Sequence, residues 1–149
     1  MANTISSLAE DIKGYPQAVV EVPLTAAQII AMYTTPVLVV PAVPEKAIIV
    51  DSVEFIMQGT ATQFTSGGVV SVQYNSTANG AGTSVQASTF AATVVTGATA
   101  VTYSTRPPAS LSAVATASIK GIGLYISNAT GVFATGTGTA IVRVTYRLV

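Results

Sequence analysis

Apolar and polar residues alternate along much of this chain with the two-residue period of a β-strand. Successive side chains of a strand point to opposite faces, so this alternation predicts strands that bury one face and expose the other. The clearest run covers residues 137–149 and places two arginines on the outward face. Its core face holds Val142, Val144, Tyr146 and Leu148, and its outward face holds Arg143, Thr145 and Arg147.

Similar patterns, bounded by Gly, Pro, Asn and Ser, predict further strands. Residues 47–57 carry apolar side chains on both faces, which indicates a central strand covered on both sides. Asp51 and Glu54 stand three positions apart in this segment and are therefore expected on opposite faces. Residues 70–74 alternate more strictly and predict a half-buried strand. The remaining predicted strands are 17–22, 37–40, 88–95, 98–104 and 118–127.

One helix is predicted between the first strands, at residues 26–33. Thr25 and Gln28 have the spacing of a capping box, in which each side chain accepts a hydrogen bond from the other residue's backbone N–H. Pro36 follows the helix and ends it, because proline disfavours helical geometry in the residue before it.

A second helical pattern lies at the N-terminus, where apolar residues recur every three or four positions. We interpret residues 1–17 as an arm or short amphipathic helix and residues 18–149 as the β-sandwich. The apolar stripe of the arm either packs on its own domain or docks on a neighbouring subunit or a larger lattice, and both alternatives stay open. The stripe consists of Ile5, Leu8, Ile12 and Tyr15.

Together these elements predict an all-β protein. We expect an antiparallel, jelly-roll-like β-sandwich with one short helix between early strands and an N-terminal arm. A parallel α/β fold is excluded, because the helices that would connect its strands are missing. A chain of 149 residues is long enough for one domain with a sizeable core.

The charge content changes the picture of the surface. Only 8% of the residues are charged and the net charge is zero, whereas about 25% is usual in a soluble domain. A surface so thinly charged is poorly protected from association. We therefore expect much of it to be buried in a homo-oligomer or a larger assembly, and the alternative is a monomer coated in Ser and Thr.

The same composition excludes much chemistry. The chain has no Cys and no His, so thiolate and imidazole metal ligands, a Cys nucleophile and a His general base are all missing. We expect no enzyme activity and no cofactor. The basic residues form no stripe, which argues against nucleic-acid binding. The apolar runs are too short to cross a membrane as helices, and the first residues lack a secretory pattern.

Four segments carry a resemblance to a known family: 22–32 (VPLTAAQIIAM), 34–42 (TTPVLVVPA), 46–53 (KAIIVDSV) and 136–148 (GTGTAIVRVTYRL). They resemble small jelly-roll structural proteins of tailed double-stranded-DNA bacteriophages, above all capsid cement or decoration proteins. The resemblance covers most of the chain and rests on structural motifs. It fails at residues 43–45, Val-Pro-Glu, where a Gly-rich turn is expected.

The resemblance implies a structural virion protein on the outer surface of the capsid, made in the host cytoplasm, that clamps neighbouring capsid subunits. Its implied partners are the major capsid protein and further copies of itself, with a homotrimer favoured over a homodimer. The candidate contact residues toward the capsid or a sister subunit are Ile5, Leu8, Ile12, Tyr15, Arg143 and Arg147.

A receptor- or glycan-binding module of a phage tail or fibre is the alternative function, since jelly rolls also serve as lectins. Aromatic residues are few, at 7% with no Trp. We interpret Tyr74, Tyr103 and Tyr125 as core or cross-strand residues rather than sugar-binding ones. A polysaccharide-cleaving enzyme with carboxylates paired across strands ranks third.

Overall fold

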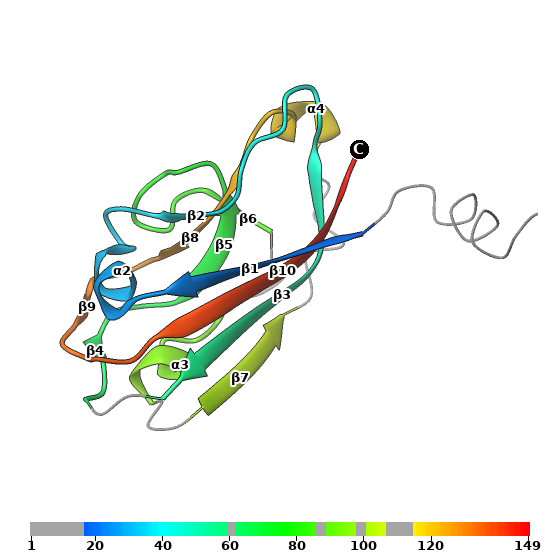
Figure 1. The fold of residues 1–149 in the computed structure, drawn as a ribbon. Helices are drawn as coiled ribbons and strands as arrows, with labels where there is room; N and C mark the ends of the chain where they lie inside the picture. The colour runs from blue at the N-terminus through cyan, green and yellow to red at the C-terminus, as the bar shows by residue number, and fades with distance from the viewer. Residues whose placement is uncertain (1–16, 60–61, 86–88, 98–100, 107–114) are drawn as a thin grey trace, which may run out of the picture.

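The computed structural model describes residues 17–59, 62–85, 89–97, 101–106 and 115–149. It is an antiparallel all-β sandwich with short helices, which confirms the predicted fold class (Figure 1). The strands are β1 (Ala18–Leu24), β2 (Val37–Val40), β3 (Ile48–Gln58), β4 (Thr65–Ser66), β5 (Val70–Tyr74), β6 (Thr83–Ser84), β7 (Val101–Arg106), β8 (Leu124–Asn128), β9 (Phe133–Ala134) and β10 (Ala140–Leu148), and the helices are α2 (Ala26–Ala31), α3 (Thr93–Thr96) and α4 (Thr116–Ile119).

The described strands form two four-stranded sheets, ordered β1-β10-β3-β7 and β2-β8-β5-β6, and the short pair β4-β9. Without β4 and β9, the remaining strands pair first with last in chain order: β1 with β10, β2 with β8, β3 with β7 and β5 with β6. A long hairpin that rolls up on itself gives this nested pairing. We interpret the order as the predicted jelly roll.

The core lies between the two sheets and is built from the inward faces of their strands. In β10, Val142 and Val144 are fully buried, as the alternation predicts, while Tyr146 and Leu148 are half-buried near the strand end. Strand β10 pairs with β1 on one side and β3 on the other. The strand with the clearest sequence pattern therefore lies inside its sheet.

Helix α2 begins where the capping box predicts. The Thr25 N–H donates to Oε1 of Gln28 at 2.9 Å, and the Gln28 N–H donates to Oγ1 of Thr25 at 3.3 Å. Ile29 and Met32 are buried, so the helix is fixed across one end of the sandwich. The prediction of a helix between the first strands is confirmed, with the helix ending at Ala31.

Two predicted strands are wrong in part. The strand predicted at 88–95 is replaced at its end by helix α3, and only Phe90 makes a bridge to β5. The strand predicted at 118–127 begins at Leu124, because α4 precedes it. Short apolar runs fit a helix and a strand equally well, so tertiary packing decides between them.

A β-bulge in β3 reverses another expectation. The register of β10 against β3 shifts between Thr145 and Tyr146, and Asp51 is the extra residue on β3. Asp51 and Glu54 therefore lie on the same outward face, and the expectation of opposite faces is wrong. The apparent second apolar face of 47–57 arises from this shift. The buried residues on the two sides of the bulge are Ile48 and Val50, then Val53, Phe55 and Met57.

Candidate interaction surfaces

The outward face of the sheet β1-β10-β3 carries an ion-pair cluster centred on Arg143. The register places Glu21 of β1 and Glu54 of β3 opposite Arg143 on either side. Nε of Arg143 lies 2.6 Å from Oε1 of Glu21, and Nη1 lies 2.7 Å from Oε2 of Glu54. The hydrogen bond to Glu21, and then that to Glu54, raises the pKa of Arg143. The cluster is thus internally paired, with one excess negative charge.

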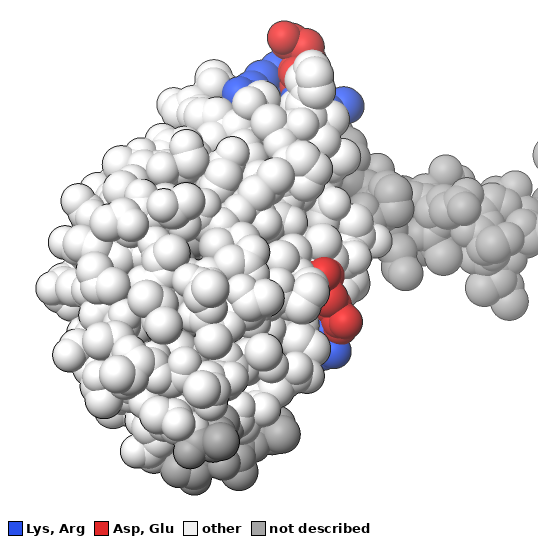
Figure 2. Space-filling view, turned by 60° about the vertical axis from the view of Figure 1, so that its left-hand side comes forward, with Lys and Arg blue, Asp and Glu red and all other residues white. Residues whose placement is uncertain are grey.

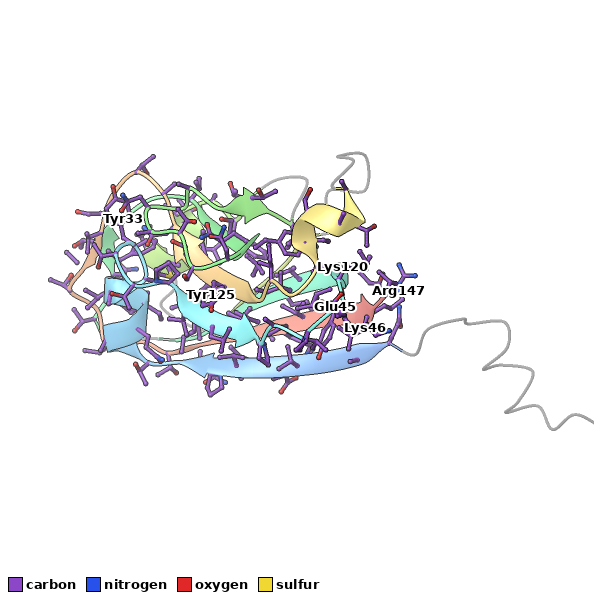
Figure 3. All side chains as sticks on the ribbon, turned by 90° about the horizontal axis from the view of Figure 1, so that it is seen from above. Tyr33, Glu45, Lys46, Lys120, Tyr125 and Arg147 are labelled. Carbon is purple, nitrogen blue, oxygen red and sulfur yellow. The ribbon has the colours of Figure 1, made fainter. Side chains whose placement is uncertain are left out.

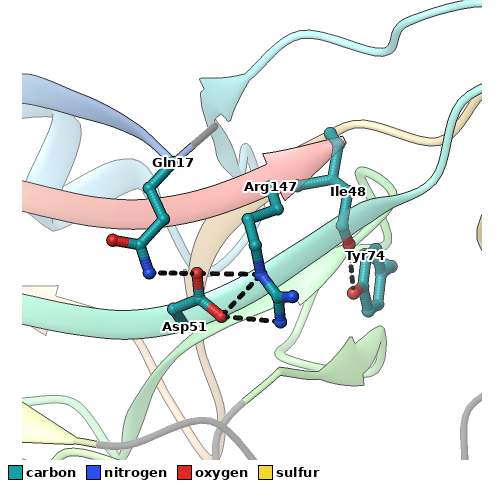
Figure 4. Close-up of polar contacts among 5 residues, drawn as sticks. All are labelled: Gln17, Ile48, Asp51, Tyr74 and Arg147. Carbon is teal, nitrogen blue, oxygen red and sulfur yellow. Dashed lines mark hydrogen bonds and ion pairs between the residues drawn. The ribbon is translucent and has the colours of Figure 1, made fainter. Parts of the chain in front are cut away.

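Arg147 forms a second ion pair beside the β-bulge (Figure 4). Its Nη2 lies 3.0 Å from Oδ1 of Asp51, and its Nε donates to both carboxylate oxygens at 3.1 and 3.2 Å. Nε2 of Gln17 donates to Oδ2 of Asp51 at 2.9 Å. The predicted outward orientation of both arginines is confirmed, with side chains 40% and 38% exposed. Their contact with a partner stays a prediction.

These ion pairs engage two carboxylates, Asp51 and Glu54, of the kind that a polysaccharide-cleaving enzyme would need. Asp51 and Glu54 share a face, but each is held by a different arginine of β10. Among the described residues, no group of three or more His, Cys, Asp or Glu could hold a metal ion. Within the same ranges, no helix is long and apolar enough to cross a membrane.

Tyr74 and Tyr125 serve the fold, as predicted. Tyr74 is buried and its hydroxyl donates to the Ile48 carbonyl at 2.7 Å (Figure 4). Burial raises the pKa of Tyr74 to about 12. Tyr125 is half-buried and lies between Leu38 of β2 and Gln73 of β5 in the sheet register. Both residues are confirmed as core or cross-strand residues.

The end of the sandwich around α2, β4 and β9 carries no charged residue. We define this uncharged end as residues 24–36, 62–69, 75–82 and 129–139. Its segments adjoin one another, because α2 contacts β9 and β9 pairs with β4. Figure 2 shows it as a continuous uncharged surface, with charged side chains only at the upper and right margins.

The charged side chains gather elsewhere on the described part of the molecule. Seen from above in Figure 3, Glu45, Lys46, Lys120 and Arg147 lie together at one end, and Tyr33 lies at the other. The remaining charges described above belong to the outward face of the β1-β10-β3 sheet. The surface is therefore divided into a charged region and an uncharged end.

Two Phe-x-x-Gly motifs hold the uncharged end together. Phe64-Thr-Ser-Gly67 and Phe133-Ala-Thr-Gly136 pair antiparallel through β4 and β9. A Cβ on Gly67 would collide with the ring of Phe133, and a Cβ on Gly136 with the ring of Phe64. The two rings are buried and pack edge to face, with centroids 6.5 Å apart. We call this arrangement the Phe-Gly clasp.

Hydroxyl groups and a tight backbone complete the clasp. Oγ1 of Thr65 donates to the Ala134 carbonyl at 3.1 Å and lies 3.2 Å from Oγ1 of Thr135. Ser66 and Thr135 both adopt positive φ, 59° and 52°, which is uncommon outside glycine. The two motifs are legible in the sequence, but 69 residues separate them, so their pairing carries no local signal.

The loop after β5 covers the outer face of the second sheet. Gln73 is fully buried, and its side chain donates to the Thr77 carbonyl at 2.6 Å and accepts from the Gly82 N–H at 3.1 Å. Oγ of Ser127 accepts from the Gly80 N–H at 3.2 Å. All of β5 is consequently buried, so the expectation of a half-buried strand is wrong.

A shallow groove runs beside α2 within the uncharged end. Oε1 of Gln28 in this groove is already engaged by the N-cap of the helix. The groove therefore offers few polar groups that could orient a small ligand. Its lining consists of Ala27, Gln28, Ala31, Thr35, Pro36 and Val37.

The arm stripe of Ile5, Leu8, Ile12 and Tyr15 lies outside the described residues, so its role stays a prediction. No protein-family model, no curated protein and no solved structure matches the chain.

Proposed function

We propose that this chain is a structural virion protein: a capsid cement protein that binds the outside of a phage head and clamps neighbouring major capsid subunits. The uncharged end is the observation that carries the proposal. A surface without charges loses little hydration when another protein covers it, whereas it protects a free monomer poorly. A protein with such an end is suited to work as part of an assembly.

The ion pairs support the same proposal. The carboxylates of Asp51 and Glu54 are held by Arg147 and Arg143, and the buried Tyr74 hydroxyl is held by a backbone carbonyl. These groups stabilise the sandwich. A cement protein requires a rigid frame and protein-binding surfaces, which is what these residues supply.

A cement protein also needs two kinds of contact, one between its own copies and one with the capsid. A standard interface takes about 800 Å² per partner, roughly a tenth of the 7653 Å² that this chain exposes. The surface has room for both. We propose a homotrimer whose arm, through Ile5, Leu8, Ile12 and Tyr15, anchors it to the capsid, and repetition over the shell multiplies weak contacts by multivalency.

The test is the light-scattering mass of the purified protein, alone and after mixing with undecorated heads. We expect a stable small oligomer that transfers to the heads and saturates at a fixed number of copies per capsid subunit. A monomer that ignores heads would overturn the proposal. A glycan array would then examine the tail or fibre alternative.

The anchoring role of the arm has its own test in the same assay. Deletion of residues 2–15, and separately replacement of Ile5, Leu8 and Ile12 by Ser, should weaken head binding without changing the fold of the sandwich. Ser6→Ala, off the apolar stripe, is the matched control and should bind as the wild type does. If the deleted chain binds heads equally tightly, the arm is not the anchor.

A further inference from the structure

Two exposed valines mark the rim of the uncharged end. Val69 and Val132 are 37% and 43% exposed; the other exposed large apolar side chains of the described residues, Val19 and Leu38, lie outside this end. The Val69 carbonyl accepts from the Ala129 N–H, and Val132 precedes Phe133 of the Phe-Gly clasp. Both valines thus flank the segment where the loops after β4 and β8 meet.

The absence of charge limits what this end can bind well. A partner that placed a Lys or Glu against it would lose the hydration of that charge and find no opposite charge in return. The complementary partner is therefore another uncharged surface that presents apolar and hydroxyl groups. Among the surfaces described above, the uncharged end itself is the one that lacks charges and presents apolar and hydroxyl groups, so the same end of a second copy is a suitable partner.

Its polar groups also carry no charge that would repel a second copy. The exposed polar residues of the clasp region include Thr65, Ser66, Thr130 and Thr135. The hydroxyls of Thr65, Thr130 and Thr135 donate to carbonyls of the same chain and keep lone pairs that can accept from a partner, whereas a carboxylate or an ammonium repels its own kind. In a symmetric oligomer, residues near the symmetry axis face the same residues of another copy. Because the uncharged end has no charged residue, such a contact brings no like charges together.

The backbone of this end is held in place before any partner arrives. Thr130 and Thr135 adopt positive φ, 70° and 52°, and Phe133 fills the space beside Gly67. A β-branched residue keeps this conformation only when its surroundings impose it. A rigid surface loses little conformational entropy on association.

We infer that the uncharged end is the surface through which copies of this chain bind one another, with Val69 and Val132 buried in the contact. This inference deepens the proposed function and rests on it for the purpose of the oligomer. The contact itself is measured without heads. In this arrangement the charged face of β1-β10-β3 and the N-terminal arm stay available to bind the capsid.

The experiment compares Val132→Glu and Val69→Glu with the matched control Val19→Glu. Val19 is 60% exposed and lies at the far end of β1 from α2. We expect the wild type and Val19→Glu to share one oligomeric mass by light scattering. Each variant at the uncharged end should dissociate, with the dissociation constant raised roughly 100-fold or more, because like charges then face each other across the axis.

The dependence of the oligomeric mass on salt concentration distinguishes this uncharged contact from an ionic one. The mass of the wild type should be the same at about 0.05 M and 1 M NaCl, since screening has no charges to act on in the contact. Dissociation at high salt would overturn the inference. Circular dichroism shows whether each variant is folded. If the Glu variants misfold, hydrogen exchange of the wild type replaces them, and residues 62–69 and 129–139 should gain protection as the protein concentration rises.

The remaining outcomes are distinguishable from failure of the proposed function. A monomeric wild type, or Val132→Glu and Val69→Glu variants that keep the full mass, would overturn the inference. If those variants stay oligomeric but no longer bind heads, the uncharged end contacts the capsid instead and the cement proposal stands. If they dissociate while the wild type ignores heads, the inference stands and the cement proposal fails.

Discussion

A glycine series tests the Phe-Gly clasp directly. Gly131, Gly121 and Gly136 differ in what an added methyl group would meet. Around Gly131 the space is open and φ is not positive. Around Gly121 the space is also open, but φ is +67°. At Gly136 φ is +95° and the ring of Phe64 occupies the position of a Cβ. Replacing each by Ala therefore separates backbone strain from steric collision.

The expected costs follow from these two terms. Gly131→Ala should leave the free energy of unfolding unchanged or raise it slightly, by up to about 1 kcal/mol, because Ala restricts the unfolded chain. Gly121→Ala should cost about 1–2 kcal/mol, the strain of a non-glycine residue at positive φ. Gly136→Ala should add a further 1–3 kcal/mol or so, because the buried Phe64 ring must move within a packed core.

The measurement is equilibrium denaturation followed by circular dichroism, since the chain has no Trp. Protein concentration is held constant, because association would itself add stability. A double-mutant cycle with Phe64→Leu isolates the collision, and the cost of Gly136→Ala should fall by about 1 kcal/mol or more in that background. If Gly136→Ala costs no more than Gly121→Ala, the clasp is not packed as described and the reasoning fails.

Three further predictions concern other parts of the fold. Arg143→Gln should lower the free energy of unfolding only slightly, because the Arg143 side chain is exposed, and the loss should shrink in 1 M salt or so; a salt-independent loss would contradict this. Gln73→Leu should lower the free energy of unfolding by about 2–3 kcal/mol and speed hydrogen exchange in the loop after β5, because the buried backbone groups of that loop lose their partner. The control Gln63→Leu, at an exposed position, should be neutral. Equal costs for the two variants would refute the role of Gln73 in holding the loop. The stabilisation linked to Tyr74 is present below the unfolded pKa of 10.0 and is lost as pH rises through the folded pKa of about 12. Denaturation at alkaline pH should show that loss in the wild type and not in Tyr74→Phe.

The sequence predicted the elements whose signals are local. The Thr25 and Gln28 capping box identifies the start of α2 without any tertiary information. The alternation around Val142 and Val144 identifies β10, because one face of that strand is buried and the other is not.

The features that could not be predicted from the sequence depend on contacts between residues far apart in the chain. The bulge at Asp51 is set by the register of β10, and nothing near Asp51 signals it. Gln73 reads as the polar side of a half-buried strand, but the loop that follows covers it. The uncharged end is visible as segments without charge, but only the fold brings those segments together.

The placement of the few charges supports self-association through the uncharged end rather than through a sheet edge. An exposed strand edge invites pairing with another chain, and proteins block it with charges, prolines or short strands. Here the edge strand β1 carries Glu21 and Pro23, β2 has four residues between Pro36 and Pro41, and β6 has two. These three edges are therefore protected against pairing, and the fourth edge strand, β7, carries a charge only at its last residue, Arg106. The uncharged end has no charges that would keep another protein away. It needs none if it is buried against the same end of other copies of this chain.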